Sequence, residues 1–168
     1  MLTSTSMFML DAIAESRNIQ YVPLDKLDAP LVSNPPLAPS CSWPNKLRSI
    51  HSYEKVESIK IGMDHLYCPL KSNNPLFNSF CLGRSSKGII LWVFQMTITK
   101  EHSGAVSDFA IILTIVQKIK QTLKVSEVGV KFVLVTPFKV DQVVKWNFPE
   151  EFKGSSVHIQ YLEVSPHL

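Results

Sequence analysis

The chain has 168 residues, of which 45% are hydrophobic, and this length suits one compact domain with a buried core. Its 17 Lys and Arg exceed its 14 Asp and Glu by three, a balance that permits nucleic-acid contact without requiring it. Three cysteines without close pairing argue against a disulfide framework and a structural zinc site. The N-terminus has no basic leader, and no apolar run reaches membrane-spanning length, so we expect an intracellular protein without a membrane partner.

Residues 1–45 are the least regular part of the sequence. Residues 19–24, IQYVPL, are compatible with a short strand, and residues 27–45 hold five of the eleven prolines. Each proline fixes its own φ and moves the preceding residue away from helical values. We therefore expect an irregular, proline-rich segment over residues 1–45 and a single α/β domain over residues 46–168.

Residues 46–62 carry apolar side chains in steps of three. These are Leu47, Ile50, Tyr53, Val56 and Ile59. The spacing predicts a helix that buries one stripe and ends at Gly62.

The following residues alternate between strand and helix patterns. Strands are predicted over 66–70, 77–83 and 88–99, and the third is apolar on both faces, which is typical of a central strand. Ser103 is a candidate N-cap for a helix over 104–124. The apolar stripe of this helix consists of Phe109, Ile112, Leu113, Val116, Ile119 and Leu123.

The rest of the chain completes the pattern. A buried strand is predicted over 128–137, a short helix or turn over 138–148, and a last strand over 156–164. A strand, a helix and a second strand imply a parallel pair, so we expect an α/β sheet covered on both faces.

Polar residues stand at the end of the predicted central strand. Gln95 and Thr97 share one face, and His102 follows shortly after. Ligands of open α/β sheets gather at strand ends, which favours a site here. The alternative is that backbone or water satisfies these groups and that His102 is a solvated turn residue.

A set of short motifs occurs in a fixed order between about residues 54 and 164. They are Tyr67 and Pro69, Pro75, Asn78 with Ser79 and Phe80, Phe94 and Gln95 with Thr97, His102, and a later strand that ends at Pro137. In this order and spacing they resemble the C-terminal, restriction-endonuclease-like domain of Crinkler and retrotransposon-hot-spot-type proteins. The resemblance implies a PD-(D/E)XK-type nuclease core, with a mixed central sheet flanked by helices.

In that family, an aspartate and a second acidic or amide group on adjacent strands hold a divalent ion, usually magnesium, and a lysine assists the cleavage of the phosphodiester. This chain has Asn78, Gln95 and Thr97 at the three positions, so none of them is charged. With His102, they form the degenerate catalytic set that the resemblance implies. We expect a catalytically inactive domain with no cofactor.

Three interpretations stay open. The first is a nuclease-like domain that has lost cleavage and persists as a nucleic-acid- or protein-binding module, or as a decaying copy linked to a mobile element. The second is an active Mg²⁺-dependent DNA nuclease whose site is completed by Glu101 or Glu57, with Asp64 as a further nearby acid. The third is a small α/β protein-interaction domain that uses the proline-rich segment around Trp43.

Clustered cations distinguish the first interpretation from the third, because phosphate binding requires clustered positive charge. The candidates for a basic groove beside Gln95 are Lys71, Arg84, Lys87 and Lys100. DNA is the candidate nucleic-acid partner, and the family resemblance adds the nucleus as a candidate location.

Overall fold

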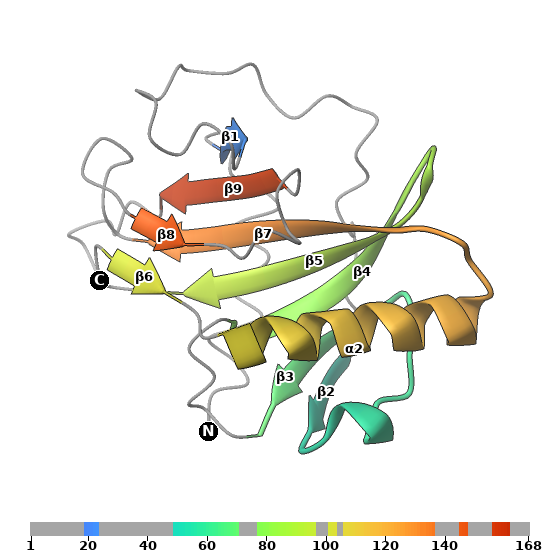
Figure 1. Ribbon diagram of the computed structural model, residues 1–168. Coiled ribbons are helices and arrows are strands. Elements are labelled where there is room, and N and C mark those ends of the chain that lie inside the picture. The colour runs from blue at the N-terminus through green and yellow to red at the C-terminus, as the bar shows by residue number, and fades with distance from the viewer. Residues whose placement is uncertain are drawn as a thin grey trace.

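The structure, a computed structural model, describes residues 19–23, 49–70, 77–96, 101–103, 106–136, 145–147 and 156–161. Within these residues the chain forms an α/β arrangement with one seven-stranded mixed sheet, one two-stranded sheet, one α-helix and one short 3₁₀ helix (Figure 1). The expectation of an α/β fold with a mixed sheet is therefore confirmed.

The large sheet has the strand order β1-β9-β7-β5-β4-β3-β2. Its strands are β1 (Ile19–Pro23), β2 (Ser49–Tyr53), β3 (His65–Pro69), β4 (Ser79–Ser85), β5 (Gly88–Met96), β7 (Val128–Thr136) and β9 (Ser156–Tyr161). β3, β4 and β5 are antiparallel neighbours, whereas β5 and β7 run parallel. The predicted parallel pair around a crossover helix is thus present.

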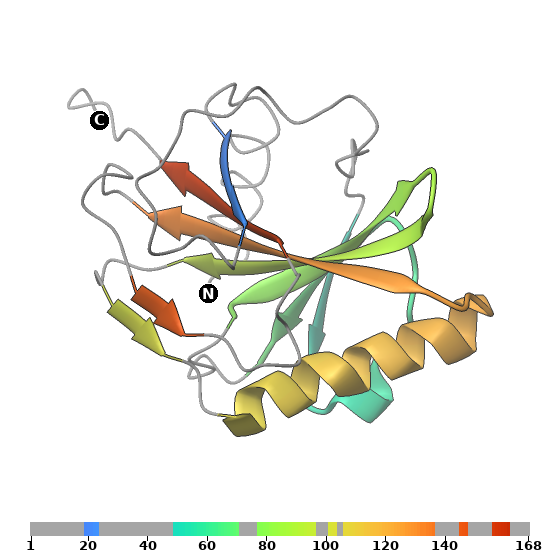
Figure 2. The same ribbon diagram turned by 45° about the horizontal axis from the view of Figure 1, so that its top comes forward.

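The crossover helix α2 (Val106–Leu123) lies across one face of the sheet (Figures 1 and 2). Alternate residues of β5 pack toward each face because successive side chains of a strand point to opposite sides. Leu91 and Val93 belong to the core cluster that includes α2, and Trp92 and Phe94 belong to a second cluster with Leu66. β5 is therefore a central strand, as its sequence indicates.

The helix predicted over residues 46–62 is wrong. This segment contains β2 and the short 3₁₀ helix η2 (Val56–Ser58). β2 pairs in parallel with β3 over its whole length, from Ser49 opposite His65 to Tyr53 opposite Pro69. Backbone pairing with a distant strand outweighs the local spacing, while Tyr53 and Ile59 are still buried in the core.

The buried stripe of α2 differs from the predicted one at Leu113, which is 45% exposed, and at Ile115, which is buried although it was not predicted to be. The helical residues that are buried are Phe109, Ile112, Ile115, Val116 and Ile119. At about 100° per residue, Leu113 lies at the edge of this stripe. Ser103 is not the N-cap, because it belongs to strand β6 (Glu101–Ser103) and α2 begins at Val106.

The short strand suggested for residues 19–24 is present as β1, which pairs with β9, so residues 19–23 belong to the large sheet. β8 (Lys145–Asn147) pairs in parallel with β6, where a short helix or turn was expected. In the part of the chain that the structure describes, no helix has the length and apolar character needed to cross a membrane.

Candidate functional site

Asn78 and Gln95 lie at the same end of two neighbouring strands. Asn78 directly precedes β4, and its backbone N–H donates a 2.8 Å hydrogen bond to the carbonyl oxygen of Phe94. The next residue, Ser79, pairs with Phe94 in the antiparallel ladder. Gln95 is 5% exposed, and Asn78 is half-buried. The structure therefore brings the backbones of these two predicted site positions together.

The other predicted residues of this site are described only in part. Thr97, Lys71 and Lys100 lie outside the described residues. Glu101 and His102 belong to β6, which follows the end of β5 in the chain (Figure 1). Their backbones pair with β8, so both residues have a strand position rather than a turn position.

Arg84 and Lys87 do not border Gln95. Both are exposed and lie where β4 passes into β5, with Arg84 opposite Ile89. Arg84 is six positions from Asn78 in the sequence, which corresponds to about 20 Å along a strand at about 3.3 Å per residue. These two cations therefore lie at the opposite end of the β4–β5 hairpin from the predicted site.

The acidic candidates with described side chains are also exposed. Asp64 lies in the turn before β3. Glu57 lies in η2, where its carbonyl oxygen accepts a hydrogen bond from Lys118 in the second half of α2. Among the described residues, no three His, Cys, Asp or Glu side chains gather in a metal-binding group. The neutral amides of Asn78 and Gln95 fit Mg²⁺ poorly, because this ion is usually bound through carboxylates.

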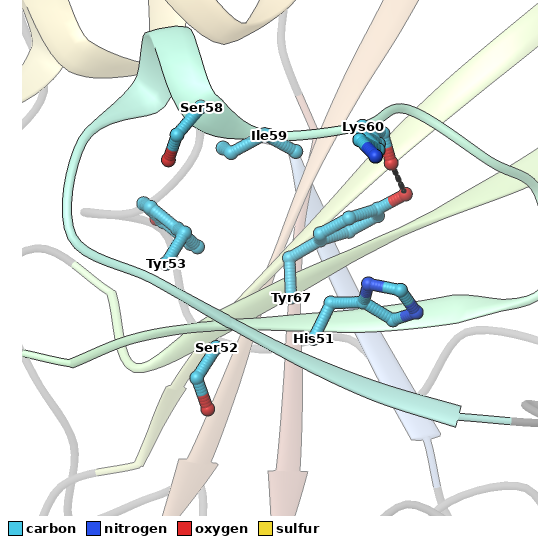
Figure 3. A pocket seen from close by; sticks show the side chains of 7 residues that line it. All are labelled: His51, Ser52, Tyr53, Ser58, Ile59, Lys60 and Tyr67. Carbon is cyan, nitrogen blue, oxygen red and sulfur yellow. Dashed lines mark hydrogen bonds between the residues drawn. The ribbon is translucent and has the colours of Figure 1, made fainter.

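A different group of residues forms a pocket beside the outermost strand β2. The pocket has a volume of about 140 Å³ and is lined by His51, Ser52, Tyr53, Ser58, Ile59, Lys60 and Tyr67 (Figure 3). It lies between the strands β2 and β3 and the segment that follows η2.

Tyr67 holds that segment in place. Its hydroxyl accepts a 2.6 Å hydrogen bond from the backbone N–H of Gly62. It donates to the carbonyl oxygen of Lys60 at 2.8 Å (Figure 3). The Tyr67 ring stacks on Phe80 with a centroid separation of 4.8 Å. Burial raises the pKa of the Tyr67 hydroxyl, and the hydrogen bond from Gly62 partly offsets this rise.

Tyr53 is the second phenol of the pocket and is 7% exposed. Its buried hydroxyl makes no hydrogen bond with any residue that the structure describes. Burial is the main cause that raises the pKa of Tyr53, and the nearby Cys68 adds to it. Tyr53 and Tyr67 are therefore neutral phenols at physiological pH.

Two histidines and a serine stand on the same face of β2 and β3 as these tyrosines. The Ser49 hydroxyl oxygen lies 2.6 Å from Nδ1 of His65 and 3.1 Å from Nε2 of His51. The two imidazole centroids are 4.1 Å apart. We call Ser49, His51 and His65 the imidazole cluster.

Sequence reasoning missed the imidazole cluster because it placed Ser49 and His51 on a helix. The available signal was their spacing of two, which puts both side chains on one face of a strand. The position of His65 opposite Ser49 depends on the parallel register of β2 and β3. That register is a tertiary property, which the local pattern does not contain.

Comparisons of the chain with protein-family models, with curated proteins and with solved structures found no match.

Proposed function

We propose that the chain is a degenerate nuclease-like domain of the Crinkler or mobile-element type, with a restriction-endonuclease-like core. In this proposal it has lost phosphodiester cleavage and acts by binding nucleic acid or a protein. The observation that supports it best is the placement of Asn78 and Gln95 at one end of the adjacent strands β4 and β5. Adjacent strands are where a PD-(D/E)XK-type site would carry its two metal ligands.

The chemistry of these positions explains the proposed loss of cleavage. An amide has nearly the size of a carboxylate and keeps one acceptor oxygen, but it lacks the negative charge that attracts a hard cation. Thr97 stands at the position of the lysine, so no cation there supports the attacking water or the developing charge. Cleavage would therefore lack both its metal and its electrostatic support.

Cleavage assays test this proposal directly. Wild type, Asn78→Asp, Thr97→Lys and the double variant are incubated with plasmid and single-stranded DNA, with Mg²⁺ or Mn²⁺ and with EDTA controls. We expect no cutting by the wild type and detectable activity only in the double variant, because charge on the ligand and charge near the phosphate are both required. Metal-dependent cutting by the wild type that Gln95→Ala abolishes would instead identify an active nuclease, with Glu101 or Glu57 as the missing ligand.

DNA binding is tested separately, through the exposed cations at the tip of the β4–β5 hairpin. Fluorescence anisotropy with labelled DNA at several salt concentrations compares the wild type with the Arg84→Ala/Lys87→Ala double variant. Each lost phosphate contact reduces the salt slope of binding to duplex DNA by about 0.9. A reduced slope supports nucleic-acid binding through this tip, whereas no binding by the wild type favours the protein-interaction alternative.

A further inference from the structure

The imidazole cluster directs one nitrogen of each of two histidine rings at the same atom. Nδ1 of His65 and Nε2 of His51 both lie within hydrogen-bond distance of the Ser49 oxygen, at 2.6 and 3.1 Å. These two nitrogens come from neighbouring parallel strands. Imidazole nitrogens that converge in this way are the preferred ligands of borderline divalent metal ions.

The backbone around the cluster holds His65 in place. A methyl group on Gly62 would lie 2.6 Å from Cδ2 and 2.7 Å from Nε2 of the His65 ring, so a larger residue at this position would force the ring to shift. Tyr67 fixes Gly62 by accepting its N–H. The ring is thereby packed on its Nε2 side, while its Nδ1 faces Ser49.

We propose that His51 and His65 form a binding site for a borderline divalent transition-metal ion, represented by Zn²⁺ or Cu²⁺. The ion would take His65 Nδ1 and His51 Nε2 as ligands, at about 2.0–2.1 Å for zinc. Both nitrogens now point at the Ser49 oxygen, so the Ser49 side chain would rotate away and give up its two hydrogen bonds when the ion binds, and water would complete the coordination. This site is separate from Asn78 and Gln95 and does not depend on the proposed nuclease ancestry.

The ligand set also defines the chemistry of the ion. Two neutral nitrogens select zinc or copper over Mg²⁺, which prefers oxygen ligands. Within the described residues, no third His, Cys, Asp or Glu completes the cluster. His51 is exposed, so the bound ion keeps open positions that face solvent.

The experiment uses the full chain without an affinity tag. Calorimetric titration with ZnCl₂ gives the stoichiometry, and electron paramagnetic resonance of the Cu²⁺-loaded chain reports nitrogen ligands. The variants are His51→Ala and His65→Ala, with His167→Ala near the end of the chain as the matched control. Loss of an outer-shell partner alone typically costs about 10–100-fold in metal affinity, so loss of a ligand should weaken binding by at least about tenfold.

We expect one saturable ion per chain, two nitrogen ligands in the copper spectrum, and weakened binding in both cluster variants but not in His167→Ala. The exposed position of His51 makes His51→Ala the decisive variant if His65→Ala fails to fold. The proposal is overturned if the wild type shows no saturable binding, or if His51→Ala binds zinc as tightly as the wild type. Either result would leave the cluster as a purely hydrogen-bonded structure.

Discussion

Tyr67 is bound to Gly62 by a hydrogen bond of 2.6 Å from the backbone N–H of the glycine to the phenolic oxygen. The same hydroxyl donates to the carbonyl oxygen of Lys60 at 2.8 Å. One side chain of β3 therefore satisfies two backbone groups of the segment that forms one wall of the pocket. This segment also positions Gly62 against the His65 ring of the imidazole cluster.

Tyr67→Phe should destabilise the chain by about 1–3 kcal/mol, because it leaves the Gly62 N–H and the Lys60 carbonyl without this partner. Tyr53→Phe is the matched control, since its hydroxyl is buried but makes no hydrogen bond with the described residues. We expect this control to change the free energy of unfolding by less than about 1 kcal/mol, or to raise it. Urea denaturation followed by circular dichroism measures both variants, and a larger loss for Tyr53→Phe would contradict the assignment of these hydrogen bonds.

Gly62→Ala should destabilise the chain by about 1–3 kcal/mol, the usual range for overpacking. The added methyl would meet the His65 ring at 2.6 Å, and the ring could move away only by disturbing its 2.6 Å contact with Ser49. A double-mutant cycle with His65→Ala isolates the clash, because the smaller side chain removes it. Strictly additive free energies in that cycle would show that the glycine is not needed for the imidazole.

Phe109→Ala should lower the free energy of unfolding by about 3–5 kcal/mol, because Phe109 is 2% exposed and packs edge-on against Phe132 of β7. Leu113→Ala, in the same helix, should cost less than about 1 kcal/mol, since Leu113 is 45% exposed. Denaturant midpoints of the two variants provide the comparison. Equal losses would indicate that α2 is rotated relative to the sheet.

The same helix shows how much of the fold can be predicted from the sequence. Its existence, its approximate bounds and its role as a parallel crossover follow from long apolar periodicity, and β5 follows from its run of apolar residues. The exposure of Leu113 does not follow, because the period defines a stripe but not which edge of it meets the sheet. Residues 46–62 were mispredicted for a related reason: the pairing of β2 with β3 involves residues about sixteen positions apart.

The two candidate sites also differ in how far the sequence predicts them. The location of Asn78 beside the end of β5 was predicted from an ordered family pattern, and the hairpin register brings it next to Phe94. The distance between Arg84 and this end follows only from the register. The imidazole cluster depends on the parallel pairing of β2 with β3, which no local motif predicts. Local sequence patterns thus predicted helices and strands, whereas the pairing of the strands determined which side chains lie close together.

Alkaline pH should lower the free energy of unfolding, because buried thiol and phenol groups stay protonated in the folded chain. Burial raises the pKa of the Cys68 thiol from 9.0 to about 11, and it also raises the pKa values of Cys81, Tyr53 and Tyr67. Between pH 9 and 11 the unfolded chain releases the Cys68 proton while the folded chain retains it. The folded state then binds more protons than the unfolded state, so the free energy of unfolding decreases as pH rises through this window.

Urea midpoints at several pH values from 7.5 to 11 measure this effect. We expect little contribution from these groups below pH 9 and a progressive loss of stability above it. Cys68→Ala removes one titrating group and should make the loss between pH 9 and 11 shallower. If the slope of stability against pH is unchanged in Cys68→Ala, this thiol ionises alike in the folded and unfolded states. A rise in stability between pH 9 and 11 would contradict the burial of all four groups, because each raised pKa lowers stability as pH increases.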